Sequence, residues 1–252
     1  PVVAVNTDSR DDEEGLARKK VSAVVDAYPN RRIFKKIDST LRGNFAAELV
    51  EVLRASGGKR VIVAPAFPAA GRTTEGGVQM VYKRPVHEEY RLNTDRLAWP
   101  TSHIPTILES CTGLGVSLHC TGDPGMAPHS LARSIEDDPH PLVVFDAVTQ
   151  HDLERIARAS LLLRDGAILC GAGGLAEALA IWWQEAAVSP EEQPPRAITS
   201  GPLLVVAGSF NPVTARQLAH LAGDFPAMPM IQIGIDDLLK GRVKRFVGEA
   251  LD

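Results

Sequence analysis

The stretch LVVFDAVTQHDLERIARASLLLRDGAILCGAGGLAEALAIWWQE, residues 142–185, decides the fold class. Two short apolar runs, 142–146 and 167–170, are each followed by a longer segment in which apolar residues recur with helical spacing. Short continuous apolar runs are typical of buried strands, and helical segments between them return the chain to the same edge of a sheet. The stretch therefore predicts two parallel strands, each followed by a helix.

The same alternation extends outward in both directions. It predicts an α/β fold with a mostly parallel sheet and flanking helices. Further strands are expected at residues 32–37, 60–64, 116–120, 2–5, 203–207 and 230–233. Helices are expected at residues 12–27, 44–56, 103–112, 130–136, 150–163, 175–185 and 213–222.

Residues 188–202, VSPEEQPPRAITSGP, are rich in proline and lack periodicity, so they are expected to form a linker. Residues 1–187 then form one domain, and residues 203–252 form part of a second. So short a second segment makes a poor independent α/β domain. Since the chain also starts directly at a strand-like run without a methionine, we expect a fragment of a longer protein.

The composition excludes several classes of protein. Of 252 residues, 44% are hydrophobic and 23% charged, which is typical of a soluble globular protein. The net charge of −4 provides no global field for nucleic acid or anionic membranes, and no apolar run reaches the roughly 18 residues of a membrane helix. Three cysteines without C-x-x-C spacing favour a reducing compartment, so a cytoplasmic location is expected.

The densest polar cluster is KKIDSTLRGN, residues 35–44, between a predicted strand and a predicted helix. Such a loop lies at the carboxyl edge of the sheet, where ligands bind in α/β proteins. Its candidate ligand-binding residues are Lys36, Asp38, Ser39, Thr40 and Arg42. Two cations, one carboxylate and two hydroxyls beside a helix N-terminus suit a small hydroxylated acid. Alternatively, Asp38 or Ser39 caps the helix and the cations are solvated.

Two further arginines follow predicted strands. Arg10, in NTDSR, is expected at the same sheet edge, where it would join Arg42 around one anion; alternatively, the segment is a capped helix start. Arg72 lies in APAFPAAGRTTEGG, residues 64–77, which is long for an ordinary connection. The alternative for that loop is a structural excursion into the hairpin-like sequence that follows.

Two turns rich in small residues precede helices. Gly171, Gly173 and Ala176 match G-x-G-x-x-A, but no acidic residue ends the next strand, so a nicotinamide-dependent dehydrogenase is a minor alternative. Close helix packing or anion contact also explains these glycines. Around Pro212, a phosphate-facing turn or a well-capped helix is expected, with candidate residues Gly208, Ser209, Asn211 and Thr214. Neither a hydrolase motif nor a protein-built transition-metal site is found.

The strings KKIDSTLRGN, APAFPAAGRTTEGG, GAGGLAEALA and VVAGSFNPVTARQL, in this order, resemble the four-carbon acid sugar kinase family. The resemblance implies ATP-dependent phosphorylation of a hydroxyl of threonate, erythronate or 3-oxo-tetronate, with Mg²⁺ bridging the phosphates. It also implies that an N-terminal α/β domain binds the acid, that a C-terminal α/β domain binds ATP, and that the active site lies between them.

The resemblance implies roles for individual residues. Arg10 and Arg42 would bind the carboxylate and Asp38 would orient a hydroxyl, while no catalytic base is assigned. The wider acid site would contain Lys36, Ser39, Thr40 and Arg72, and the nucleotide site Gly173, Gly208, Ser209, Asn211 and Thr214. The expected partners are a small sugar acid and ATP, without nucleic acid or membrane, and a homo-oligomer is compatible with this scheme.

The sequence departs from the family at both ends. It lacks the family's N-terminal D-D-x-T-G-A turn and its C-terminal nucleotide loop resembling G-G-D-T-A. The chain alone is therefore expected to bind the acid weakly without turnover, and a non-catalytic small-acid-binding module is the alternative function.

Overall fold

The computed structural model describes residues 2–91, 99–120, 126–186, 205–208 and 212–242. The chain comprises two compact units, Pro1–Glu192 and Gln193–Asp252.

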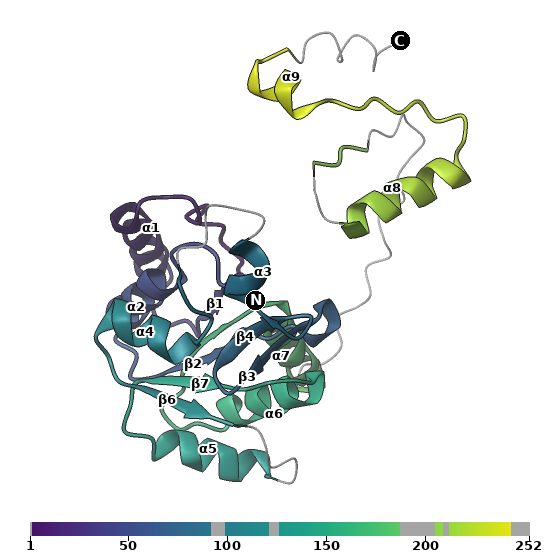
Figure 1. Cartoon of the computed structure of the whole chain (residues 1–252). Helices are drawn as coiled ribbons and strands as arrows, with labels where there is room; N and C mark the ends of the chain where they lie inside the picture. The colour runs from purple at the N-terminus through teal and green to yellow at the C-terminus, as the bar shows by residue number, and fades with distance from the viewer. Residues whose placement is uncertain (1, 92–98, 121–125, 187–204, 209–211, 243–252) are drawn as a thin grey trace. The chain divides into compact units, whose positions relative to one another are not determined.

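The first unit contains a five-stranded parallel sheet between two layers of helices (Figure 1), which confirms the α/β class. The strand order is β1 (Phe34–Lys36), β8 (Ile168–Gly171), β2 (Val61–Ala64), β7 (Leu142–Phe145) and β6 (Val116–His119). One layer contains α1 (Glu14–Ala27), α2 (Phe45–Ser56) and α4 (Ile104–Thr112). The other contains α5 (Pro128–Glu136), α6 (Gln150–Leu161) and α7 (Gly173–Ala186). The expected helix bounds are confirmed to within two residues.

The central strands are continuously apolar because both of their faces are covered. In β2, Val61 and Val63 pack toward α1, α2 and α4, whereas Ile62 packs toward α5, α6 and α7. All four residues of β7 are completely buried in the same alternating way. The alternation of side chains along a strand thus divides the core into two hydrophobic clusters, one on each face of the sheet.

A small antiparallel sheet follows β2, within and beyond the long loop that the sequence predicted. It consists of β3 (Arg72–Glu75), β4 (Val78–Val81) and β5 (Arg84–Pro85), between the 3₁₀ turn η1 (Pro68–Ala70) and α3 (Val86–Arg91). Gly76 and Gly77 make the β3–β4 turn with φ of 57° and 75°, a region that favours glycine. The expected hairpin is confirmed, but Arg72 lies in a strand.

The strand expected at residues 2–5 is wrong. These residues line a cavity beside β1 without pairing to it, and Val2, Val3 and Val5 are 82%, 53% and 45% exposed. An apolar run forms a strand only where a neighbouring strand completes its hydrogen-bond ladder, and sequence pattern does not reveal whether that neighbour is in reach.

In the second unit, the described residues form α8 (Pro212–Asp224) and α9 (Ile235–Leu239). The strand expected at residues 230–233 is wrong, and so is the described part, 205–207, of the strand expected at 203–207; residues 203 and 204 lie outside the described part. Val206 is 83% exposed and Met230 59%. No described strand of this unit offers them a partner. None of the described helices is long and apolar enough to cross a membrane.

The glycine-rich turn that starts α7, directly after β8, is a site of close packing. A Cβ atom on Gly174 would lie 2.8 Å from the carbonyl oxygen of Ala66 and 2.7 Å from Leu153. One on Gly173 would lie 3.0 Å from the ring of Phe67. These contacts favour the packing interpretation of the turn over a dinucleotide site.

We therefore expect Gly174→Ala to lower the free energy of unfolding by about 1–3 kcal/mol, because the new methyl group meets backbone that has little room to move. Gly15→Ala is the matched control, since nothing lies within 4 Å of the Cβ position at Gly15 in α1. Alanine should raise stability there by up to about 1 kcal/mol. Urea unfolding measures both, and effects of equal sign would contradict this description of the turn.

Candidate functional site

A cavity of about 1230 Å³ lies beside β1 and is lined by residues from both helical layers. Small-molecule pockets usually measure about 300–1,000 Å³, so the cavity exceeds the needs of a small acid. Its apolar lining includes Val21, Val25, Phe34, Val52, Leu169 and Leu179. Its charged lining consists of six basic residues and four acidic residues, namely Arg10, Arg31, Arg32, Lys35, Lys36, Arg42, Asp8, Asp11, Asp38 and Glu48.

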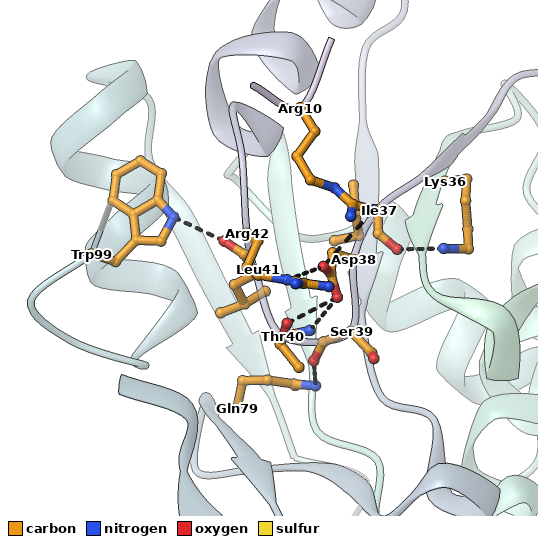
Figure 2. A network of polar contacts seen from close by, with 10 residues as sticks. All are labelled: Arg10, Lys36, Ile37, Asp38, Ser39, Thr40, Leu41, Arg42, Gln79 and Trp99. Atoms are coloured by element: carbon orange, nitrogen blue, oxygen red, sulfur yellow. Dashed lines mark hydrogen bonds and ion pairs between the residues drawn. The ribbon is translucent and has the colours of Figure 1, made fainter. Parts of the chain in front are cut away.

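The central feature of the charged lining is a carboxylate shared by two arginines (Figure 2). Asp38 Oδ2 accepts a hydrogen bond from Arg42 Nε at 2.5 Å and lies 3.9 Å from Arg10 Nη2. The Asp38 side chain is 10% exposed, whereas those of Arg10 and Arg42 are 57% and 44% exposed. Arg10 and Arg42 thus both approach Asp38, and their expected binding of one ligand anion stays a prediction.

Arg10 reaches this position because its segment packs closely on the start of α2. Asn44 Nδ2 donates hydrogen bonds to the carbonyl oxygens of Ser9, at 3.1 Å, and Asp12, at 2.8 Å. Gly43 adopts φ of 82°, and a Cβ atom there would lie 2.9 Å from Arg10 Cγ and 3.0 Å from the Arg10 carbonyl oxygen. Glycine at this position therefore permits the contact between the two segments.

The second carboxylate oxygen of Asp38 forms hydrogen bonds within the same loop. Asp38 Oδ1 accepts hydrogen bonds from the backbone N–H and the hydroxyl of Thr40, both at 2.9 Å. Burial acts to raise the pKa of the Asp38 carboxyl, but the N–H of Thr40, the Arg42 guanidinium and the Thr40 hydroxyl together outweigh it. The pKa therefore lies below its ordinary value of 3.8, and Asp38 is ionised at neutral pH.

The next residue, Leu41, has a left-handed backbone with φ of 58°, which is uncommon for a leucine. Its side chain is 1% exposed. Trp99 Nε1 donates a hydrogen bond of 3.0 Å to the Leu41 carbonyl oxygen. Core packing and the hydrogen bond from the Trp99 indole together stabilise this strained backbone conformation, and Arg42 is the next residue in the chain.

The cavity lining also contains a buried ion pair. Glu48 Oε2 is 2.6 Å from Lys35 Nζ, and Glu48 Oε1 accepts a hydrogen bond of 2.5 Å from the Ser9 hydroxyl. The side chains of Glu48 and Lys35 are 6% and 15% exposed. Glu48 thus connects β1 to the segment that carries Arg10. The neighbouring Lys36 donates from Nζ to the carbonyl oxygen of Ile37 at 2.8 Å.

The structure brings only some of the expected site residues to this cavity. Arg10, Lys36, Asp38 and Arg42 line it, while Ser39 and Thr40 belong to the same loop but not to the lining. Arg72 lies apart from the lining, where its guanidinium stacks over Tyr82 and donates to the Ala70 carbonyl oxygen.

One expected nucleotide-site residue, Gly173, belongs to the first unit, and it is not part of the cavity lining. Gly173 starts α7 and packs against Phe67. Gly208 and Thr214 belong to the second unit, whereas Ser209 and Asn211 lie outside the described residues.

Sequence reasoning missed several residues that hold the site together, namely Ser9, Lys35, Glu48, Gln79 and Trp99. One signal was available, because Glu48 lies on the apolar stripe of α2 formed by Phe45, Leu49 and Val52. A charged residue on such a stripe requires a buried partner.

The structure thus combines a parallel α/β sheet with a cavity beside its edge strand β1, and basic residues outnumber acidic ones in the lining of that cavity. A family model described as the sugar-binding N-terminal domain matches residues 1–179. The chain belongs to this family. The comparisons also confirm the resemblance to four-carbon acid sugar kinases.

Among curated proteins, the chain is 37% identical over 229 residues to a D-threonate kinase of Bordetella bronchiseptica, covering 87% of this chain and 51% of the relative. It is 35% identical over 225 residues to a D-threonate kinase of Cupriavidus necator, covering 87% and 53%. A D-erythronate kinase of Heliobacterium modesticaldum is 29% identical over 240 residues, covering 86% and 49%. The chain thus spans about half the length of these relatives.

Solved structures support the fold. A Bordetella bronchiseptica protein, crystallised as a domain-swapped dimer with bound citrate, matches with a TM-score of 0.63 and 34% identity, covering 88% of this chain and 52% of that chain. A Haemophilus influenzae protein matches with a TM-score of 0.69 at 18% identity, covering 91% and 56%, and supports the fold alone.

Proposed function

We propose that the first unit binds the carboxylate of a four-carbon sugar acid at Arg10 and Arg42, as part of an ATP-dependent sugar-acid kinase. The observation that carries this proposal is the pair of guanidinium groups on one carboxylate, Asp38. Two positive charges share one negative charge there, so a cationic excess faces the cavity although the chain carries a net charge of −4. Lys36 increases this excess.

The geometry supports different roles for the residues of the proposed acid site. Arginine has five N–H donors in a planar fork, so a guanidinium that contacts Asp38 keeps donors for a second carboxylate. Asp38 already accepts from Thr40 and Arg42. We therefore assign Asp38 mainly to aligning the arginines, in place of the hydroxyl-binding role expected from the sequence. Lys36 lines the cavity and is left to recognise the hydroxyls, whereas Ser39, Thr40 and Arg72 lie outside the lining and are the weakest members of the proposed site.

The phosphoryl donor is proposed on the names of the relatives, which are kinases. The candidate residues for ATP are Gly208, Ser209, Asn211 and Thr214 of the second unit and, separately, Gly173 of the first unit. In the described part of the chain, no three side chains of His, Cys, Asp and Glu gather as a metal site. Kinases generally use Mg²⁺, and we propose that it would be held here mainly through the phosphates of ATP.

We also propose a cytoplasmic location and a homo-oligomeric assembly for the protein. The described cysteines, Cys111, Cys120 and Cys170, are free thiols, which suits the cytoplasm. Burial raises the pKa of the Cys170 thiol to about 12, so this thiol stays protonated. A homo-oligomer is proposed because the Bordetella bronchiseptica structure is a dimer.

Calorimetric titration with D-threonate, with the uncharged polyol threitol as matched control, tests the acid site. We expect binding of the acid and none of the polyol, since the arginines recognise the carboxylate. Equal binding of both, or of neither, would refute the proposal. ATP consumption by the full-length protein that depends on added D-threonate or D-erythronate tests the kinase activity. Acid binding by the full-length protein without turnover would favour the alternative of a non-catalytic binding module.

A further inference from the structure

The side chain of Gln79 joins three separate segments, and Figure 2 shows its contact with Ser39 in the loop of the proposed acid site. Gln79 lies in β4 and is completely buried. Its Nε2 donates to the carbonyl oxygen of Ser39 at 2.7 Å and, more weakly, to that of Pro65 at 3.4 Å. Its Oε1 accepts a hydrogen bond of 2.7 Å from the hydroxyl of Thr74.

A buried primary amide is costly unless its donors and acceptor are satisfied. Here the amide finds a partner on each side, and one partner is the backbone of the loop that contains Asp38 and Arg42. An apolar side chain of the same size would leave the Ser39 carbonyl oxygen without this donor. The Gln79 amide therefore fixes where the loop lies, in addition to filling space.

The hairpin that carries Gln79 is itself anchored to the main sheet. Asp146, directly after β7, accepts hydrogen bonds from the backbone N–H groups of Gly76 and Gly77, both at 2.8 Å. Thr74 and Ala147 exchange backbone hydrogen bonds of 2.9 and 3.0 Å. The hairpin is thus attached to the end of β7, and Gln79 connects it to the segments that follow β1 and β2.

We propose that Gln79 is a positioning residue of the acid site, and that the β3–β4 hairpin acts as a brace that presets the Asp38–Arg42 pair for its ligand. This inference rests on the proposed acid-binding function. Holding a binding loop in its bound geometry lowers the ordering cost at the moment of binding. The proposal also assigns a role to residues 64–77, which include strand β3 of this hairpin, although the structure does not bring Arg72 to the cavity.

Gln79→Met removes the amide at similar volume, and we expect it to raise the Kd for D-threonate about tenfold. Gln150→Met is the matched control, because Gln150 Nε2 makes a similar bond of 3.0 Å to the Gly174 carbonyl oxygen away from the loop. The control should leave the Kd unchanged. If the native chain binds D-threonate and Gln79→Met binds it equally well, the inference is wrong while the proposed function stands.

Two readouts separate positioning from a purely structural role. In the Arg42→Ala background, Gln79→Met should change the Kd by less than about twofold, since the amide acts through Arg42; equal effects in both backgrounds would overturn the inference. Without ligand, Gln79→Met should speed hydrogen exchange at the Thr40 and Leu41 amides, which bond to Asp38. Unchanged exchange at both amides would also overturn it, whether or not the native chain binds the acid.

Discussion

Arg42→Ala is expected to weaken the binding of D-threonate by about 1.5–3 kcal/mol, which is roughly 10- to 150-fold in Kd. The variant removes charge-assisted hydrogen bonds to the ligand carboxylate. It also leaves Asp38 with Arg10 as its remaining charged neighbour, 3.9 Å away, so a negative charge stays where the ligand carboxylate should bind. Isothermal titration calorimetry measures the change in Kd.

Arg54→Ala is the matched control for this variant. Arg54 pairs with Glu51 on α2, and neither residue lines the cavity. Its loss should leave the Kd for D-threonate within about twofold, because exposed ion pairs contribute little beyond their immediate neighbours. If both alanine variants weaken binding equally, or if Arg42→Ala binds as the native chain does, Arg42 does not contact the acid.

Glu48→Leu is expected to lower the free energy of unfolding by about 3–5 kcal/mol, because it leaves the largely buried ammonium of Lys35 without its counter-charge. The variant also removes the acceptor of the Ser9 hydroxyl. Both losses affect the same place, the contact between β1, α2 and the segment that carries Arg10. Urea unfolding monitored by circular dichroism gives the free energy.

The double variant Lys35→Met/Glu48→Leu separates an unpaired charge from lost packing. With both charges removed, most of the stability should return, since apolar side chains of similar volume often replace a buried ion pair without loss. A single Glu48→Leu variant that loses less than about 1 kcal/mol would show that Lys35 is hydrated without Glu48, and that this ion pair does not hold the cavity wall together.

The main sheet could be predicted from sequence because its central strands are buried on both faces. The segments of β2 and β7 are apolar at every position. Such short, continuous apolar runs are typical of strands in parallel sheets that are covered on both faces. The same reasoning was wrong for residues 2–5, where Val2 and Val3 are exposed. An apolar run indicates that a segment could be a strand, but only the rest of the chain decides whether a neighbouring strand is there to pair with it.

The loop of the candidate site could be predicted because its polar residues follow a strand at the carboxyl edge of the sheet. Its supports could not, since Gln79 and Trp99 lie 40 and 58 positions away from the loop residues whose carbonyl oxygens they hold. The sequence motif includes Gly43, but the reason for a glycine there, the close approach of Arg10, is visible only in the structure. Arg72 was a wrong prediction of the opposite kind. The sequence placed it in a ligand-binding loop, whereas in the structure it lies in strand β3.

The central claim is that Arg10 and Arg42 together bind a sugar-acid carboxylate, and a crystal structure of the chain with D-threonate tests it most directly. The account predicts the carboxylate oxygens within about 2.7–3.2 Å of guanidinium nitrogens of both arginines. Density for the acid at another place, or its hydroxyl end at the arginines with the carboxylate turned away, would contradict it.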